Sequence, residues 1–202
     1  MGANWVQLTS GGGYDFDQKE IFGPFDVKRD LAKPLSVVNR CGGHADYLWP
    51  VAIHSVAVAR TIESMTKDPA AAFAGLMHDA HECVIGDILT PVARYIGYEQ
   101  VNKLKSEVQT AVEQRLNIRP EFSALNPANV EYIRLADLAA LHIERQLFLV
   151  PSPRDWGYPV PPNEWLRTMY GHMREMVDDN WDLDGGCEKW LEYYSNWVQY
   201  AV

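Results

Sequence analysis

The chain has 202 residues, of which 47% are hydrophobic and 22% are charged. These proportions are typical of one globular domain and exclude a disordered, collagen-like or low-complexity chain. The 27 acidic residues outnumber the 18 basic ones, and the net charge of −9 disfavours a protein that coats nucleic acid, because an acidic surface repels the phosphate backbone.

Cysteine usage and the amino terminus indicate a reducing compartment. Cys41, Cys83 and Cys187 are too few and too scattered for a disulfide framework or a zinc ribbon. The first residues hold neither a basic segment nor a long apolar run, and the apolar stretch at residues 70–77 is far too short to cross a bilayer. We therefore expect a soluble cytoplasmic protein that does not act at a membrane.

The amino-terminal segment, residues 1–34, is rich in Gly and Pro and has no sustained period, which predicts loops and a short strand or hairpin. Pro50 suits the first turn of a helix that follows it. The apolar face of that helix recurs at helical spacing, with Val51, His54, Val58, Ile62 and Met65.

A second helix is predicted to begin at Asp68 and Pro69, an N-cap acid followed by proline at the first helical position. The pattern predicts that this helix continues without a break through the apolar residues 70–77 and the polar residues 78–82, and ends near Gly86.

Further helices are predicted over residues 99–116, 127–149, 163–178 and 187–200, with a proline-rich loop over 151–162. The second of these starts on Asn126 and Pro127, which repeat the capping signal. We find no alternating pattern long enough to build a sheet. The predicted fold is therefore all-α, a compact helical bundle that forms a single domain over residues 1–202.

The densest group of metal-ligating side chains is His78, Asp79, His81 and Glu82. On a helix, His78 and Glu82 lie one turn apart on the same side, whereas His81 points away from them, beside the ligands or toward solvent. Imidazole and carboxylate groups bind Zn, Mn, Fe and Co. A crowded polar helix end is the alternative, but it does not explain why the group directly follows an apolar run.

Two more polar residues interrupt apolar helix faces. A lone histidine such as His54 is more often a hydrogen-bonded core residue than a ligand. Asp137 is more telling, because a buried carboxylate is costly unless it is paired or binds a cation. A salt bridge to Arg134 or Arg145 is the alternative. The apolar stripe that Asp137 interrupts consists of Val130, Ile133 and Leu141.

The order and spacing of His54, the pair His78-Asp79 and Asp137 resembles the HD-domain metal phosphohydrolases, in particular the branch of YfbR-like 5′-nucleotidases and phage dATP triphosphohydrolases. The similar stretches are 35–44, 51–58 and 76–91. The resemblance implies a helical HD core over 35–150, followed by a proline loop and terminal helices over 151–202, in a bacterial or phage-infected cytoplasm.

The resemblance also implies roles. His54, His78, Asp79 and Asp137 would bind one divalent metal ion, with Co, Mn, Zn, Fe and Mg all open. Glu82 would be the general acid or base.

The substrate would meet a second set of residues. Asp87 would be a second acid that holds the sugar 3′-OH or the leaving oxygen. Arg40 would contact phosphate, with a surface salt bridge as the alternative, and His44 would add a second cationic donor. Cys41 replaces an aromatic residue that packs on the sugar in the nucleotidases. The family also has a lysine two residues after the Thr-Pro pair; here that position is Ala93, and Arg94 follows it.

Three functions are compatible with these residues. The first is a deoxynucleoside triphosphate triphosphohydrolase that prefers dATP and releases deoxyadenosine and triphosphate, which the Gly-Gly-His loop after Arg40 favours. The second is a 5′-nucleotidase for deoxynucleoside monophosphates, and the third a metal-free HD scaffold that binds nucleotide. The first needs extra cations, for which His44, Arg94, Lys103 and Lys105 are candidates.

The tryptophan-rich segment 156–197 is expected to cover the bundle and to support a homo-oligomer.

Overall fold

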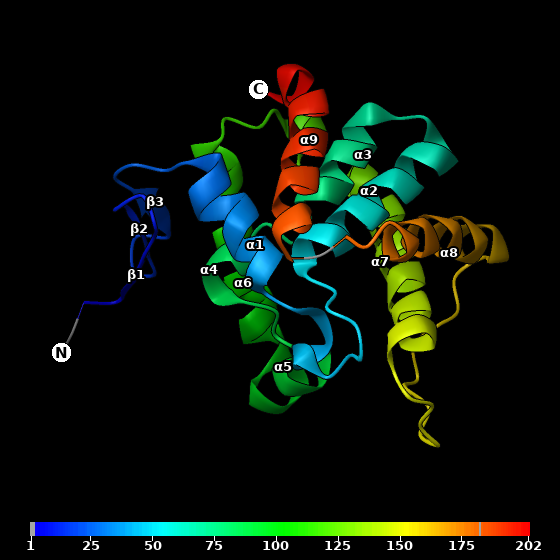
Figure 1. The fold of residues 1–202 in the computed structure, drawn as a ribbon. Coiled ribbons are helices and arrows are strands. Elements are labelled where there is room, and N and C mark those ends of the chain that lie inside the picture. The colour runs from blue at the N-terminus through cyan, green and yellow to red at the C-terminus, as the bar shows by residue number, and fades with distance from the viewer. Residues whose placement is uncertain (1–2, 182) are drawn as a thin grey trace.

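The computed structural model describes residues 3–181 and 183–202, and the fold of these residues is a helical bundle (Figure 1). Its helices are α1 (Lys33–Val37), α2 (Val51–Thr66), α3 (Pro69–Met77), α4 (Glu82–Ile85), α5 (Thr90–Ile96), α6 (Tyr98–Arg115), α7 (Pro127–Phe148), α8 (Asn163–Asp178) and α9 (Leu183–Ala201). Short π- and 3-10-helical turns span Val27–Ala32, Arg40–Gly43 and Pro120–Phe122. The predicted all-α class is confirmed.

A small antiparallel sheet occupies the amino-terminal segment, beside the helices in Figure 1. Its strands β1 (Trp5–Gln7), β2 (Gly13–Asp15) and β3 (Glu20–Phe22) pair in sequence order. Gly13 is required in the middle strand, since a Cβ there would lie 2.6 Å from the Phe22 ring. The glycine-rich composition that predicted loops therefore also serves close packing between strands.

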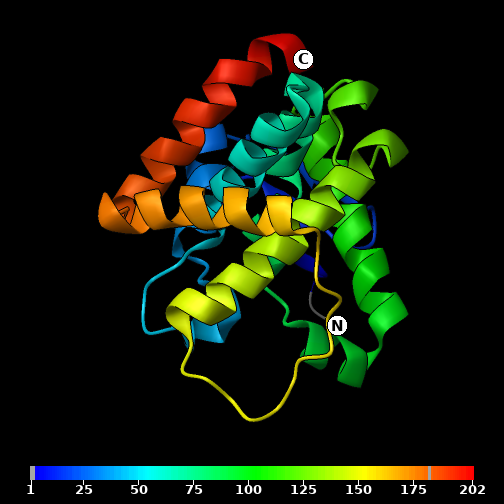
Figure 2. The same cartoon turned by 90° about the vertical axis from the view of Figure 1, so that its right-hand side faces the viewer.

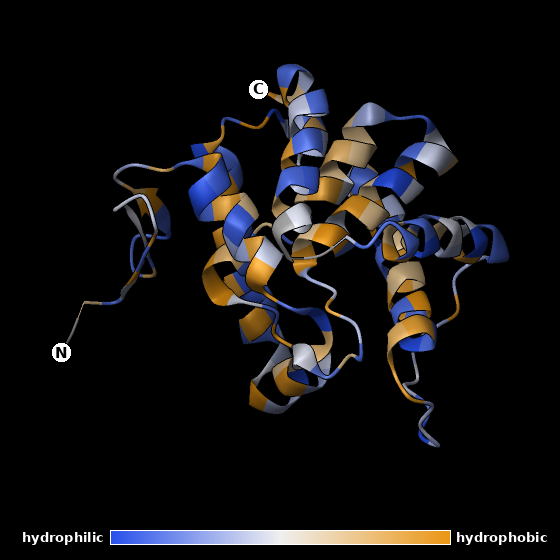
Figure 3. Ribbon diagram, viewed as in Figure 1, coloured by the Kyte–Doolittle hydropathy of each residue, from blue (hydrophilic) through white to orange (hydrophobic). Residues whose placement is uncertain are grey.

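Helix α2 lies at the centre of the bundle and contacts α3, α7, α8 and α9. Residues 51–59 are all buried, and Figure 3 shows the hydrophobic residues of α2 and α3 gathered in the middle of the molecule. Gly75 lets α3 approach α2 closely, because a Cβ at that position would lie 2.6 Å from Cδ1 of Ile62. Figure 2 shows α8 running across α7 on one side of this pair.

The predicted helix over residues 69–86 is interrupted. It begins as expected, with the Asp68 carboxylate accepting from the N–H groups of the first turn, but α3 ends at Met77. A tight turn follows at 78–81 before α4 begins. Gln109 of α6 holds the break: its Oε1 accepts the His81 N–H at 3.1 Å and its Nε2 donates to the Met77 carbonyl at 2.8 Å. The short helix α5 was not predicted either.

The predicted apolar stripe of α7 was also wrong in part. Val130 is exposed, and the buried face consists of Ala136, Ala139, Ala140 and Ile143. Small alanines let α7 pack against α2 and α3, which moves the buried face around the helix. Asp137 consequently lies at the rim of that face, with its side chain 44% exposed.

The tryptophan-rich segment contributes to the core. Four of its tryptophans are buried, at positions 165, 181, 190 and 197, together with Met169, Met173 and Met176 of α8. Trp156 lies in the proline loop, where the Arg145 guanidinium sits 4.9 Å from its ring centroid. Among the described residues, none of the helices combines the length and hydrophobicity needed to span a membrane.

Candidate metal centre

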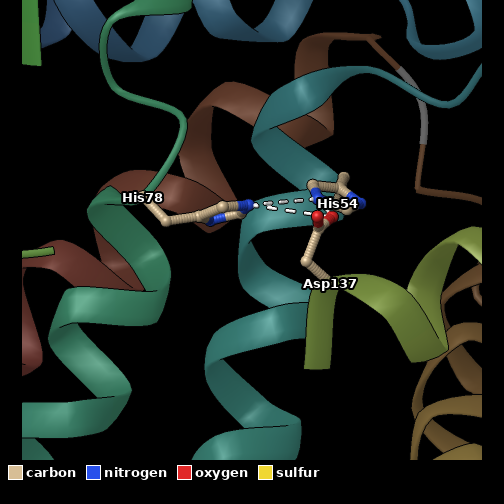
Figure 4. Close-up of side chains that lie close together, drawn as sticks. All are labelled: His54, His78 and Asp137. Atoms are coloured by element: carbon tan, nitrogen blue, oxygen red, sulfur yellow. Dashed lines mark hydrogen bonds and ion pairs between the residues drawn. The ribbon is translucent and has the colours of Figure 1, made fainter. Parts of the chain in front are cut away.

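Side chains from three separate parts of the fold meet at the end of α3. His54 comes from the first turn of α2, His78 follows α3, and Asp137 comes from α7; Figure 4 shows the three pointing toward one another. The Nε2 atoms of the two histidines are 3.4 Å apart, and Asp137 Oδ1 lies 3.2 Å from His54 Nε2. The ligand atoms of these three residues all lie within 4.8 Å of one another, as a shared cation requires.

Asp79 completes the group. Its Oδ2 lies 3.1 Å from His78 Nε2 and 3.6 Å from His54 Nε2. The structure therefore brings together all four residues that the sequence nominated as ligands. Asp137 pairs with neither arginine that was considered as an alternative partner, since Arg134 binds Glu131 and Arg145 lies near Asp155.

The outer nitrogen of each histidine is hydrogen-bonded away from the centre. Nδ1 of His78 lies 2.7 Å from the Gly75 carbonyl, and Nδ1 of His54 lies 2.7 Å from Oε1 of Glu144. Both partners are acceptors, so each Nδ1 carries a hydrogen and donates it. Each Nε2 is thereby aimed at the centre, which is the arrangement found where histidine binds a metal ion.

The charges around the centre also suit a divalent cation. Burial lowers the pKa of His54 and Arg40 lowers it further, but the carboxylates of Glu144 and Asp137 outweigh both and raise it to about 9. Burial acts to raise the pKa of Asp79, yet the His78 and His54 imidazoles hold it well below its usual range. Burial opposes ionisation of Asp137 in the same way, and His54 again lowers its pKa.

One atom of the group is left without a hydrogen bond. Oδ1 of Asp137 is buried and has no hydrogen-bond partner within the described chain, although the rest of its side chain is exposed. Its charged neighbours are His54 Nε2 at 3.2 Å and Arg40 Nη2 at 3.7 Å, and a cation would supply the direct partner that a buried carboxylate oxygen needs. The donor set therefore fits one divalent ion, bound by two imidazole nitrogens and two carboxylates, with positions left for water and substrate.

His81 and Glu82 lie beside the ligands: His81 is the last residue of the turn after α3, and Glu82 is the first residue of α4. Glu82 is only 2% exposed; burial and the neighbouring carboxylates of Asp79 and Asp87 raise its pKa well above the usual value, and its Oε2 has no hydrogen-bond partner among the described residues. His81 does not face solvent: it is buried against Gln109, and burial lowers its pKa to about 4. Asp79, His81 and Glu82 form a second group whose spacing could hold an ion.

Arg40 reaches the centre from the 3-10 turn after α1. Its guanidinium lies 3.2 Å from Glu144 and 3.7 Å from both Asp79 and Asp137. The predicted alternative of a surface salt bridge is wrong, because the Arg40 side chain is largely buried. The Arg40 charge also acts on Asp87, lowering a pKa that burial raises overall.

Comparison with known proteins places this arrangement in a family. The HD domain family matches residues 51–146, a span that contains His54, His78, Asp79 and Asp137. Residues 51–146 therefore form an HD domain. HD domains bind a divalent metal ion and are generally phosphohydrolases, and the helical bundle described above is their fold.

Two relatives of this HD domain have no described function. The chain is 30% identical to the uncharacterized protein RCAP_rcc00048 of Rhodobacter capsulatus over 167 residues, which cover 78% of this chain and 81% of that protein. It is 27% identical to the uncharacterized protein YfdR of Escherichia coli over 120 residues, covering 59% and 60% of the two chains. The names of these relatives state no substrate.

The remaining predicted substrate residues lie farther out. Cys41 follows Arg40 in the left-handed region, with φ of 58°, and is half-buried. His44 is exposed in the same turn. Arg94 is exposed on α5, where its guanidinium lies 5.8 Å from the Tyr158 ring centroid. Within the described chain, neither His44 nor Arg94 forms an ion pair or hydrogen bond with the centre.

The sequence reasoning missed one residue of this HD domain, Glu144. It lies seven residues after Asp137, so both share one face of α7 two turns apart. That spacing was a usable signal, because a second carboxylate on the same helix face is also too costly to bury without a partner.

Proposed function

We propose that this HD domain is a metal-dependent phosphohydrolase for deoxynucleotides, which breaks the bond between the 5′ oxygen and the α-phosphorus. The first candidate is a deoxynucleoside triphosphate triphosphohydrolase that converts dATP to deoxyadenosine and triphosphate. The observation that carries the proposal is the convergence of two imidazole Nε2 atoms and two carboxylates, with the Arg40 guanidinium 3.7 Å from Asp79 and Asp137.

The chemistry divides between the ion and the side chains. A divalent cation, when bound, lowers the pKa of a bound water and polarises a phosphoryl oxygen. His54, His78, Asp79 and Asp137 would hold that ion. Arg40 would bind a phosphate oxygen through the part of its guanidinium that faces the centre, since guanidinium groups suit phosphate geometry.

Glu82 would supply the proton that the 5′ oxygen needs when its bond to phosphorus breaks. Burial and two adjacent carboxylates favour the protonated form of Glu82, which is the form a general acid requires. Asp87 lies within electrostatic reach of Glu82 and Arg40 and would accept a hydrogen bond from the sugar 3′-OH.

A specific observation also favours the second candidate, a 5′-nucleotidase for deoxynucleoside monophosphates. A triphosphate needs cations for two further phosphates, yet His44 and Arg94 lie away from the centre, and Lys103 is exposed beside Glu107. Lys105 is the exception. It is half-buried on α6, and its charge lowers the pKa values of Glu82 and Asp87. Lys105 is therefore the group on which the triphosphate reaction would depend.

One experiment tests these alternatives. The purified protein is incubated with Mn²⁺ and either dATP or dAMP, and the products are scored for triphosphate or orthophosphate. A triphosphohydrolase releases triphosphate from dATP, and Lys105→Gln then raises KM for dATP while the exposed control Lys103→Gln leaves KM unchanged. A nucleotidase releases orthophosphate from dAMP only. A protein that binds no divalent metal and shows no metal-stimulated turnover would be a scaffold, and the proposal would be wrong.

A further inference from the structure

Glu144 is the most completely hydrogen-bonded carboxylate at the centre, although it is not one of the four nominated ligands. It is 1% exposed and lies on α7, two turns after Asp137. Four donor atoms converge on its two oxygens, from His54, Trp49 and Arg40. Burying a carboxylate costs free energy unless each oxygen is satisfied, and here both are.

We propose that Glu144 is a positioning residue that couples metal binding to phosphate binding. It orients the imidazole of His54 toward the ion and holds the guanidinium of Arg40 beside it. The first half of this inference needs only the metal centre, and the second half rests on the proposed function.

The hydrogen bond to His54 sets which nitrogen of that ring is available. Oε1 of Glu144 lies 2.7 Å from His54 Nδ1, so this nitrogen keeps its hydrogen and Nε2 faces Asp137 and His78. A carboxylate behind a metal-binding histidine fixes ring orientation and makes the imidazole a better ligand. His54 is fully buried, and Glu144 is the hydrogen-bond partner that its Nδ1 has within the described chain.

The carboxylate is itself held in place by Trp49. The indole Nε1 donates to Oε1 of Glu144 at 3.0 Å, and the Trp49 ring is buried 5.0 Å from the Phe148 ring centroid. Phe148 is one turn beyond Glu144 on α7. The position of the carboxylate is therefore set by packing as well as by charge.

Arg40 is held by both oxygens of Glu144. Its Nε lies 3.3 Å from Oε1 and its Nη2 lies 3.2 Å from Oε2, a two-pronged pairing that fixes the plane of the guanidinium. Nη1 is left over and lies 3.7 Å from Oδ2 of Asp79. The pairing thus presents one edge of the guanidinium to the centre, where a phosphate oxygen would bind.

A purely structural role, the neutralising of a buried arginine, predicts a loss of stability and nothing else. Metal affinity separates the two roles. Glu144→Gln keeps the shape of the side chain but replaces one oxygen by an amide donor that cannot face Arg40. The matched control is Asp30→Asn: Asp30 is also 1% exposed and accepts hydrogen bonds from the backbone N–H groups of Ser10 and Asp26.

The test measures Mn²⁺ binding to the full chain by equilibrium dialysis without nucleotide, after circular dichroism has shown that both variants fold. Glu144→Gln is expected to raise the Mn²⁺ Kd by about 10- to 100-fold, as loss of a group that orients a ligand typically does, and Asp30→Asn is expected to leave it unchanged. At saturating Mn²⁺, Glu144→Gln also raises KM for the nucleotide. A folded Glu144→Gln protein with the wild-type Kd overturns the proposal.

A measurement on the wild type covers the case in which Glu144→Gln does not fold. With ¹⁵N-labelled histidine and bound Zn²⁺, the Nδ1 hydrogen of His54 is expected to persist and to exchange slowly with water. Loss of that hydrogen overturns the proposal. The two proposals can fail separately: a wild type that binds Mn²⁺ but hydrolyses neither dATP nor dAMP contradicts the proposed function, whereas an unchanged Kd in an active enzyme contradicts the role of Glu144.

Discussion

The two sides of the centre differ in how well their polar groups are satisfied. On the side formed by α2 and α7, the outer nitrogen of His54 and both oxygens of Glu144 have hydrogen-bond partners, and the exception is Oδ1 of Asp137, which faces the centre. On the side formed by the turn after α3 and the start of α4, His81 Nε2 and Glu82 Oε2 are buried without a hydrogen-bond partner in the described chain. Since unsatisfied buried groups are costly and concentrate where chemistry occurs, we expect the first side to position the centre and the second side to act on substrate.

The largest effect is expected where the two sides meet. Asp137→Ala removes a carboxylate whose Oδ1 lies 3.2 Å from His54 Nε2. Loss of the metal contribution, several kcal/mol of transition-state stabilisation, should lower kcat/KM by at least about 10³-fold and remove the bound metal. Asp155→Asn in the proline loop, where the side chain is exposed, is the control. Full hydrolytic activity in Asp137→Ala would rule out the metal centre.

The next largest effect distinguishes a catalytic role of Glu82 from a role as a metal ligand. Glu82→Gln should lower kcat by about 10²- to 10⁴-fold, the range of a general acid or base, while Mn²⁺ binding stays at the wild-type level. Because burial raises the pKa of Glu82, replacing it by a neutral amide should not lower the unfolding temperature. Steady-state kinetics, metal content and thermal unfolding check this. A variant that loses its metal would instead make Glu82 a ligand.

A pH titration probes the positioning side. The His54 pKa rises from 6.5 to about 9 in the folded protein, so its stabilising contribution is present below pH 6.5 and disappears as pH rises through 9. That contribution is at most about 3 kcal/mol. Urea unfolding with a chelator should show lower stability at pH 9.5 than at pH 6, and a smaller difference in His54→Gln. Mn²⁺ affinity should rise toward pH 9, because binding displaces the His54 proton.

The smallest effect concerns the packing that places His78. Gly75→Ala puts a Cβ 2.6 Å from Cδ1 of Ile62 and should destabilise the protein by about 1–3 kcal/mol through overpacking between α3 and α2. The Gly75 carbonyl also accepts the Nδ1 hydrogen of His78, so metal affinity should fall slightly. Ile62→Val in the same chain should restore part of the stability in urea unfolding. If Gly75→Ala alone stabilises the protein, the close approach of α3 to α2 does not require a glycine at this position.

Local signals predicted the helix starts well. Asp68 and Asn126 cap α3 and α7 with side-chain hydrogen bonds to the N–H groups of the first turn, and α8 spans the predicted residues 163–178. Caps depend on neighbouring residues only, so a sequence contains all the information they need. The apolar face of α2 is a weaker match, because residues 51–59 are all buried whichever side of the helix they lie on, and Met65 is only partly buried.

The break after Met77 depends on a distant residue. The apolar and polar pattern of residues 69–86 is compatible with one helix, and nothing local interrupts it. The hydrogen bonds that replace the helical ones come from Gln109, 28 residues beyond His81. The packing of the helices decides which side chain of another helix reaches the interrupted backbone. A sequence pattern therefore could not predict this break.

The sequence by itself determined the helical class and predicted that His54, His78, Asp79 and Asp137 form one group. Polar residues on apolar helix faces are costly to bury unless they bind a common partner such as a metal ion. Only the tertiary structure decided that these residues meet, that Arg40 is buried among three carboxylates, and that Glu144 stands behind His54. Hydrogen-bond partners of a buried site come from segments about 90 residues apart in the chain, and they become neighbours only when the helices pack.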